Sequence, residues 1–231
     1  DYPFRNAHLS ASERTEDLIS RMTLEEKIDL LAGYNDFYLH PCARLGIPAF
    51  RMADGPLGVA SWGLWGRATA FPAALSVAAS WNRDLAYRIG EMYAAEWRAR
   101  GLHFMLAPGV NIYRASKGGR NFEYYGEDPV LTSQMIVPFI QAVQKGGVIA
   151  TVKHFAGNDQ EFDRYTVSTE VSRRALHEIY LRPFRAAVEE AGVKAVMTGY
   201  NPLNGTYCTE NKWLIDVLKK DWGFKGILMS D

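Results

Sequence analysis

Short apolar runs alternate along this chain with longer stretches in which apolar residues recur every three or four positions. The runs are typical of strands buried on both faces, and the periodic stretches are typical of amphipathic helices. Five runs predict strands, at residues 47–54, 103–107, 148–155, 194–201 and 226–231. Residues 69–80 fit either one more short strand or a helical turn, because the apolar period does not separate the two.

Helix-start signals come before the periodic stretches. Ser10 with Glu13, and Thr23 with Glu26, have the spacing of capping boxes. In a capping box, the side chain of each residue accepts a hydrogen bond from the backbone N–H group of the other. We therefore expect an N-terminal helical lead-in over residues 1–46, ahead of a main body over residues 47–231.

Four helices are expected in the main body, between the strands. Their predicted start signals are Asn82, Asp128-Pro129, Ser172 and Asn211, which are cap residues or a cap followed by a first-turn proline. The predicted apolar face of the first of these helices consists of Leu85, Ile89, Met92 and Trp97. Apolar strands alternating with amphipathic helices predict an α/β fold, with a parallel sheet covered by helices.

Two parallel architectures fit this pattern, an open doubly wound sheet and a (β/α)8 TIM-like barrel. No strand is followed by the G-x-G-x-x-G sequence of a dinucleotide-binding sheet, which counts against the first. Polar residues gather near the carboxyl ends of the strands, namely Asp54, Arg120, Lys153, His154, Tyr200, Asn201 and Asp231. In a barrel all of these ends meet at one mouth, so we expect a barrel whose first five or six β/α units lie in residues 47–231.

Composition narrows the classes of partner. The chain has 231 residues, 48% of them apolar, and its 26 basic and 26 acidic residues are interspersed, which argues against nucleic acid and anionic membranes as partners. No apolar run approaches the roughly 20 residues of a membrane span. The sequence begins at Asp1, and we expect either a removed signal peptide, with a secreted or periplasmic location, or a trimmed chain.

Two loops carry the candidate chemistry, residues 119–129 and 153–165. They supply a guanidinium, an ammonium, an imidazole and several carboxylates, and Trp62 and Trp65 lie in an earlier loop as possible stacking surfaces. Such a set suits a ligand with many hydroxyl groups and apolar ring faces, which describes a sugar. We predict no metal and no cofactor, because no metal-ligand spacing occurs and the adjacent Lys153 and His154 would point different ways on a regular strand.

Seven segments together resemble the N-terminal catalytic domain of glycoside hydrolase family 3, of the β-glucosidase type. They are RMTLEEKIDLLAG, MADGPLGV, GRNFEYYGEDP, KHFAGNDQEFDR, VSRRALHEIYLRPF, AVMTGYNPLNGTYCTEN and DWGFKGILMSD, and the resemblance covers residues 10–231 in the family's order. The resemblance implies a retaining, exo-acting β-glucosidase with a barrel-like first domain. It also implies that the rest of the barrel and an α/β-sandwich domain, which supplies the acid/base, follow in the same polypeptide.

The resemblance also implies roles for single residues. Ser230-Asp231 matches the family's nucleophile motif, so Asp231 is the expected catalytic nucleophile, and basic neighbours are expected to keep it ionised. The implied sugar contacts are Asp54, Arg120, Lys153, His154, Arg164 and Tyr200. Asp54 would accept bonds from hydroxyl groups, whereas Lys153, His154 and Arg164 would donate bonds and offset the charge of the acids.

The expected substrate is a β-glucoside or cello-oligosaccharide, consistent with a role in cellulose degradation. Asp54, where xylosidase-like members tend to carry Glu, favours glucose, but the sequence also fits a β-xylosidase of the same family. An inactive sugar-binding relative and an unrelated parallel α/β enzyme, such as a phosphosugar isomerase, are two further hypotheses. Glu123 and Glu127 stay outside the predicted catalytic set, since acidic residues before Pro129 also suit the start of a helix.

Overall fold

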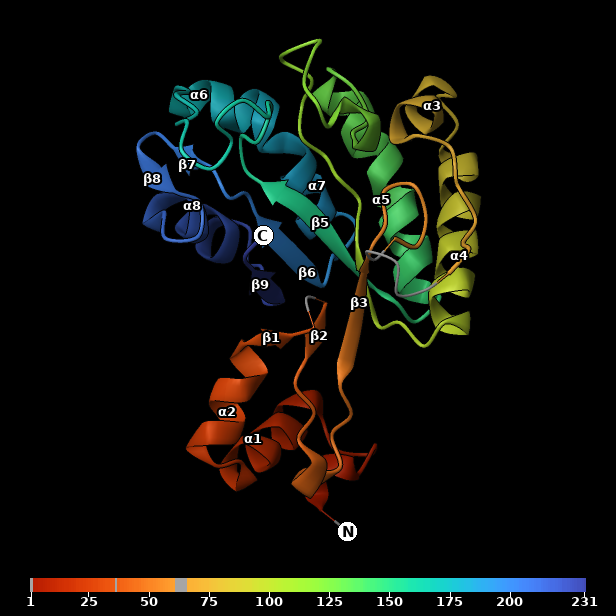
Figure 1. Cartoon of the computed structure of the whole chain (residues 1–231), viewed down its shortest axis with the longest axis vertical. Coiled ribbons are helices and arrows are strands. Elements are labelled where there is room, and N and C mark those ends of the chain that lie inside the picture. The colour runs from red at the N-terminus through yellow and green to blue at the C-terminus, as the bar shows by residue number, and fades with distance from the viewer. Residues whose placement is uncertain (1, 36, 61–65) are drawn as a thin grey trace. The chain divides into compact units, whose positions relative to one another are not determined.

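The computed structural model describes residues 2–35, 37–60 and 66–231, and Figure 1 labels its helices and strands. The chain divides into two compact units, Asp1–Arg51 and Met52–Asp231. Trp62 and Trp65, the predicted stacking residues, lie outside the described residues.

The first unit is mainly helical. Its elements are η1 (Pro3–Arg5), α1 (Ala11–Arg21), α2 (Leu24–Leu31), β1 (Gly33–Tyr34), β2 (Tyr38–Leu39), η2 (Ala43–Leu45) and the first residues of β3 (Phe50–Asp54). Both predicted capping boxes are present, at Ser10 and at Thr23. A small core of Phe4, Met22, Cys42 and Leu45 holds the unit together.

The second unit contains a parallel sheet. Its strands are β3, β4 (Phe104–Leu106), β5 (Ile149–Phe155), β6 (Ala195–Thr198) and β9 (Ile227–Met229), and each pairs in parallel with the next. Strand order follows chain order, without the reversal that defines a doubly wound sheet. Parallel strands in chain order, connected by helices, are the arrangement of a TIM-like barrel, as the sequence predicted.

Helices and short turns connect the strands of the second unit. They are α3 (Ala74–Ala79), α4 (Arg83–Ala99), η3 (Asn121–Glu123), α5 (Pro129–Lys145), α6 (Arg173–Ala175), η4 (Leu176–Tyr180), α7 (Arg182–Glu189), α8 (Lys212–Asp216) and η5 (Val217–Asp221), with a hairpin of β7 (Pro202–Leu203) and β8 (Thr206–Tyr207). All four predicted start signals cap helices, and residues 69–80 hold the helix α3 rather than a strand. Within the described ranges, no helix has the length and apolar character needed to cross a membrane.

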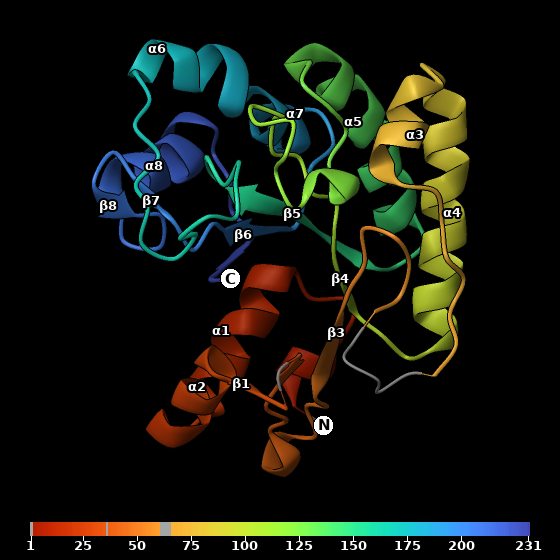
Figure 2. The ribbon, with the colours of Figure 1, turned by 45° about the horizontal axis from the view of Figure 1, so that its top comes forward.

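The packing of α4 against α5 corrects the predicted apolar face of α4. Figures 1 and 2 show α5 between α4 and α7. Leu85 and Met92 are exposed, whereas Gly90 and Ala94 belong to the buried face. A Cβ atom at Gly90 would lie 2.6 Å from the carbonyl oxygen of Phe139, so close approach of the helices selects small residues. Because this face includes small residues, the pattern of large apolar residues in the sequence does not outline it.

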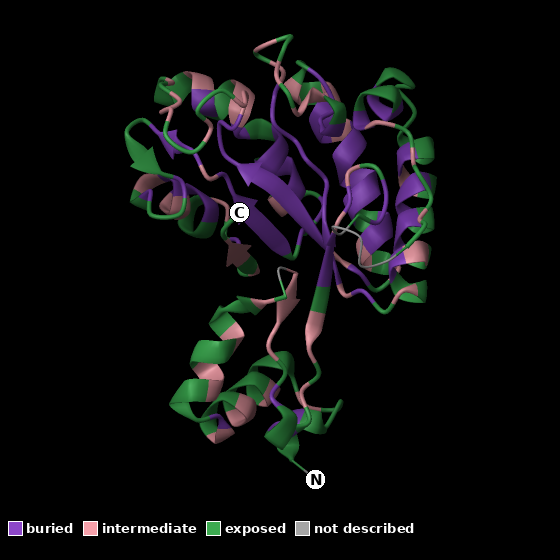
Figure 3. Ribbon diagram, in the orientation of Figure 1, coloured by how far each residue is buried: buried purple, intermediate pink, exposed green. Residues whose placement is uncertain are grey.

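An irregularity in β5 changes the direction of two side chains. Val152 pairs with Val196 and Phe155 pairs with Thr198, so β5 has one more residue than β6 between the two pairs. Such a bulge re-aims side chains and is common next to functional sites. Lys153 and His154 lie within it, on a strand that is buried over most of its length (Figure 3). Both side chains reach the same polar cluster, contrary to the expectation of opposite directions.

Candidate functional site

The carboxyl ends of the parallel strands carry the seven predicted site residues. Asp54 ends β3, Arg120 precedes η3 in the loop after β4, Lys153 and His154 lie in β5, Arg164 lies in the loop after β5, Tyr200 follows β6 and Asp231 follows β9. Because neighbouring parallel strands end at the same edge of a sheet, residues far apart in sequence meet there. Six of the seven form two directly bonded groups, which Glu123 links through Arg120 and Lys153: Asp54 with Lys153, and Arg120 with Tyr200, His154 and Asp231.

Lys153 is a buried cation between two carboxylates. Its Nζ atom donates to Oδ1 of Asp54 over 2.5 Å and lies 3.6 Å from Oε2 of Glu123. The side chain of Lys153 is 4% exposed, whereas that of Asp54 is 40% exposed. The two acids offset the desolvation of the ammonium group, and the Asp54 side chain remains partly exposed.

Arg120 uses all three of its nitrogen atoms. Its Nε atom donates to Oε1 of Glu123, Nη1 donates to the hydroxyl oxygen of Tyr200 over 2.8 Å, and Nη2 lies 2.9 Å from Nε2 of His154. Burial is the largest single influence and disfavours the charged guanidinium, but the charge and hydrogen bond of Glu123, together with Tyr124 and Tyr200, outweigh burial and raise the pKa of Arg120. Arg120 is therefore a fixed positive charge that orients two other residues of the site.

His154 is a neutral hydrogen-bond acceptor at Nε2. Arginine can only donate, so the contact with Arg120 assigns the ring proton to Nδ1, which faces the Tyr124 hydroxyl at 3.1 Å. Burial, together with the charges of Lys153, Arg120 and Arg164, holds the pKa of His154 well below its ordinary value. This corrects the expectation that His154 donates bonds and offsets negative charge.

Asn111 fixes the backbone and the ring of His154. The Oδ1 atom of Asn111 accepts from the backbone N–H of His154 over 2.8 Å, and its Nδ2 atom donates to the carbonyl oxygen of His154 over 2.9 Å. Asn111 is 2% exposed, and the sequence did not point to it. Asn111 lies five residues beyond β4, near the strand end where the other candidate residues gather. That position is the one feature of the sequence that could have indicated a role in the site.

Asp231 lies beside His154 with its Oδ2 atom 3.6 Å from Nε2. Because His154 is neutral, this contact is not an ion pair. Burial raises the pKa of Asp231, while Arg120 and Lys153 act in the opposite direction and Glu123 and Asp54 add to the rise. The expected basic neighbours, Arg120 and Lys153, do favour the ionised form, but burial and the two acids outweigh them in setting the direction of the pKa shift.

Arg164 lies at the edge of this cluster rather than within its hydrogen-bond network. It donates to Oε2 of Glu161 over 2.6 Å and to the hydroxyl oxygen of Tyr165 over 2.7 Å. Its guanidinium carbon lies 4.9 Å from the ring centroid of Tyr200, which is a stacking distance. Arg164 thus reaches the other predicted residues through the ring of Tyr200.

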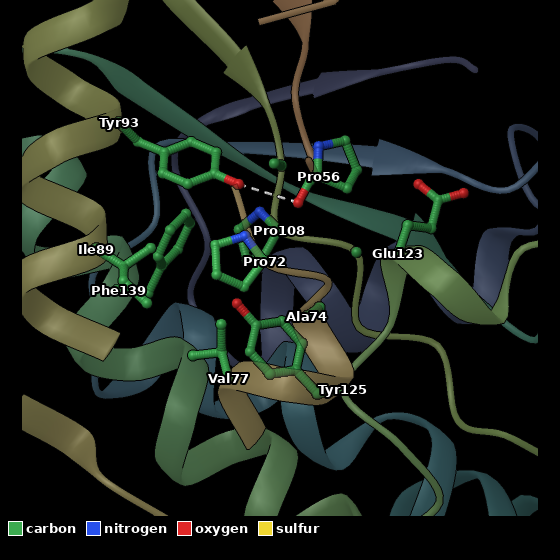
Figure 4. A pocket seen from close by; sticks show the side chains of 12 residues that line it. Pro56, Pro72, Ala74, Val77, Ile89, Tyr93, Pro108, Glu123, Tyr125 and Phe139 are labelled. Carbon is green, nitrogen blue, oxygen red and sulfur yellow. Dashed lines mark hydrogen bonds between the residues drawn. The ribbon is translucent and has the colours of Figure 1, made fainter. Parts of the chain in front are cut away.

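A small apolar cavity next to Glu123 is too small for a sugar. It has a volume of about 20 Å³, room for roughly one water molecule. Figure 4 shows Tyr93 donating to the carbonyl oxygen of Pro56, over 3.1 Å, beside the rings that line the cavity. This bond anchors the turn that follows Asp54. The Glu123 carboxylate points away from those rings (Figure 4).

The cluster is not arranged as a metal site. Among the residues that the structure describes, no group of three or more His, Cys, Asp and Glu side chains could hold a metal ion. The cations Lys153 and Arg120 occupy the space between the carboxylates instead. Alternating acids, cations and a tyrosine hydroxyl offer donors and acceptors in turn, which is what a polyhydroxylated ligand requires.

Comparisons with known proteins identify the family of this barrel-type fold. Residues 24–231 match the description "Glycosyl hydrolase family 3 N terminal domain", so the chain belongs to that family, as the motifs indicated. It is 46% identical to a β-glucosidase of Rhizobium radiobacter and 47% identical to one of Bacteroides ovatus, each over 94% of this chain.

Solved structures agree in fold. β-Glucosidase 3B of Thermotoga neapolitana, in complex with α-D-glucose, superimposes with a TM-score of 0.87 and 41% identity over 95% of this chain. A β-glucosidase of Kluyveromyces marxianus in complex with glucose gives a TM-score of 0.90 at 39% identity over 94% of this chain. The chain spans only 26% to 34% of the length of these four relatives.

Proposed function

We propose that this chain is the sugar-binding and nucleophile-bearing part of a retaining, exo-acting β-glucosidase that removes terminal, non-reducing β-D-glucosyl residues by double displacement. The observation that carries the proposal is the position of Asp231 at a strand end, in contact with His154 within the cluster of Arg120, Lys153 and Asp54. The family and the names of its relatives support the same activity.

In the proposed reaction, the Asp231 carboxylate attacks the anomeric carbon and forms a glycosyl ester as the leaving oxygen departs with a proton. Water then cleaves the ester, with net retention at the anomeric carbon. A second carboxyl group donates the first proton and later activates the water. Lys153 engages both Asp54 and Glu123, which leaves these acids poorly placed for that role, so we assign the acid/base to another part of the polypeptide.

The other residues bind the glucosyl ring in this proposal. Asp54 is held by Lys153 through Oδ1, and its partly exposed carboxylate accepts bonds from sugar hydroxyl groups. Lys153 and Arg164 donate to hydroxyl groups, whereas the Nε2 atom of His154 accepts from Arg120 and offers the sugar no proton. Tyr200, which accepts from Arg120, keeps its own hydroxyl proton for the nucleophile or the ring oxygen. β-Glucosides and cello-oligosaccharides are the proposed substrates.

Trapping of the covalent intermediate tests this proposal. In the whole polypeptide that contains these residues, a 2-deoxy-2-fluoro-β-glucoside should label Asp231, because the fluorine slows breakdown of the ester. Peptide mapping locates the label, and Asp231→Asn should abolish both labelling and turnover of nitrophenyl β-glucoside. Asp221→Asn, a change at an exposed aspartate near the same strand, should leave both intact. A label elsewhere, inversion of configuration, or faster turnover of the β-xyloside would contradict the proposal.

A further inference from the structure

Glu123 is a buried acid whose two oxygens contact two different cations. It is 2% exposed, with Oε1 accepting from Nε of Arg120 and Oε2 lying 3.6 Å from Nζ of Lys153. An isolated buried carboxylate is strongly unfavourable, and paired cations are what make it tolerable. The pairing reaches across the site, because Lys153 belongs to β5 whereas Glu123 and Arg120 belong to the loop after β4.

The two cations that pair with Glu123 also contact other residues of the site. Arg120 directs its two terminal nitrogens to Tyr200 and His154, and Lys153 directs its ammonium group to Asp54. Glu123 thus pairs with each cation while that cation also contacts a predicted sugar-site residue. A neutral or shorter side chain at this position would leave the guanidinium and the ammonium group free to adopt other directions.

The backbone at Glu123 is itself held in place. A Cβ atom added to Gly109, in the segment after β4, would lie 3.0 Å from the carbonyl oxygen of Glu123 and 2.9 Å from the ring of Tyr124. The two segments therefore pack with no space for a side chain between them. This packing gives Glu123 a fixed platform, which a residue that orients others requires.

We propose that Glu123 is the positioning residue of the sugar site, which orients Arg120 and Lys153 without touching the substrate. The inference rests on the proposed function and deepens it, because the oriented groups are the proposed sugar contacts. It distinguishes Glu123 from Glu127, an exposed acid in the same sequence motif. The motif therefore contains one acid that organises the site and one that lies at its surface.

Kinetics of the whole polypeptide test the inference. Glu123→Gln, which keeps the shape and removes the charge, should lower kcat/KM for nitrophenyl β-glucoside roughly 10- to 100-fold, the range for misplaced binding groups. Glu123→Asp keeps the charge but cannot reach both cations, and should give a smaller loss. Glu127→Gln should stay within about twofold of the parent enzyme, because surface changes away from special features have small effects.

A double-mutant cycle separates positioning from a general structural role. If Glu123 acts through Arg120, the loss caused by Arg120→Lys should be several-fold smaller in the Glu123→Gln background than in the parent enzyme, because groups that act as a unit are not additive. A merely structural residue would instead lower the melting temperature and give independent, multiplying losses. That second pattern would overturn the inference.

A crystal structure of Glu123→Gln gives a readout that does not depend on activity. The Arg120 guanidinium should leave the hydroxyl of Tyr200, and the ammonium group of Lys153 should move relative to Asp54. If both contacts persist unchanged, the inference is wrong even where the parent enzyme hydrolyses glucosides. A parent enzyme without glucosidase activity would contradict the proposed function instead, and the structure would still decide whether Glu123 orients the two cations. Should Glu123→Gln fail to fold, the same comparison with Glu123→Asp decides the question.

Discussion

The ammonium nitrogen of Lys153 lies 2.5 Å from Oδ1 of Asp54, although the two residues are 99 positions apart in sequence. The bond joins the ends of β5 and β3, which are separated in the sheet by β4. Lys153 is almost fully buried and Asp54 is partly exposed, so the cation anchors an acid that still faces solvent. The same Asp54 carboxylate therefore stabilises the buried Lys153 and remains available to accept hydrogen bonds from ligand hydroxyl groups.

Substitution of Asp54 should therefore affect activity and stability together. Asp54→Asn removes a charged acceptor, and kcat/KM for β-glucosides should fall roughly 10²-fold or more, since contacts to hydroxyl groups contribute several kcal/mol in the transition state. It also leaves Lys153 with Glu123 as its remaining acidic contact, so the free energy of unfolding should fall by about 1–3 kcal/mol. Steady-state kinetics and denaturant unfolding measure both effects. Asp29→Asn, at an exposed site, should change neither, and normal kinetics for Asp54→Asn would remove Asp54 from the site.

The acid limb of the activity profile should report Asp231. The proposed nucleophile must be ionised, and burial raises its pKa above the ordinary aspartate value, so kcat/KM should fall as the pH drops through that raised pKa. Lys153 acts to lower the pKa of Asp231, so Lys153→Met should move the acid limb to higher pH, in addition to any loss of rate. Lys219→Met, at an exposed lysine, serves as the control. An acid limb that does not respond to Lys153→Met would argue against this assignment.

His154 should make the protein less stable in mild acid. Its pKa in the folded protein lies well below the ordinary value of about 6.5, so below that pH the unfolded chain gains a proton that the folded protein does not. Stability is therefore retained above about pH 6.5 and falls as the pH falls below it. Unfolding measured from pH 7 to pH 5 should show this slope, and His154→Gln should reduce it. The same slope in His154→Gln, or its loss in the exposed-site control His8→Gln, would exclude His154 as the cause.

Asp159 should have the opposite pH dependence. Burial raises its pKa to about 7 against the opposing charge of Arg114, and its Oδ1 atom has no hydrogen-bond partner among the described residues. The folded protein keeps this proton as the pH rises from about 4 to about 7, whereas the unfolded chain loses it, so Asp159 lowers stability over that range. Asp159→Asn, which cannot ionise, should increase the free energy of unfolding at pH 7 by up to a few kcal/mol, because each unit of pKa shift corresponds to about 1.4 kcal/mol. A decrease at pH 7 would show that the carboxylate is stabilised by contacts other than these.

Local signals in the sequence were sufficient for the elements and their order. Cap residues such as Ser10, Asn82 and Asp128 act on backbone groups within a few residues, so their meaning does not depend on the rest of the fold. The same holds for the apolar strands, whose alternation with helices fixed the parallel α/β class. The candidate site could then be placed at the carboxyl ends of the strands. These ends meet at one edge in any parallel sheet, whatever the side chains around them.

The sequence alone also supplied the seven candidate residues, through motifs that extend over nearly the whole chain. Only the tertiary structure decided what those residues do to one another. The protonation of His154 depends on Arg120, from a different loop, and the shared direction of Lys153 and His154 depends on a bulge that forms against β6. Likewise, the role of Glu123 and the small-residue face of α4 depend on contacts across 30 or more positions. Burial, charge pairing and close packing act through space, and the order of residues along a chain does not contain these distances.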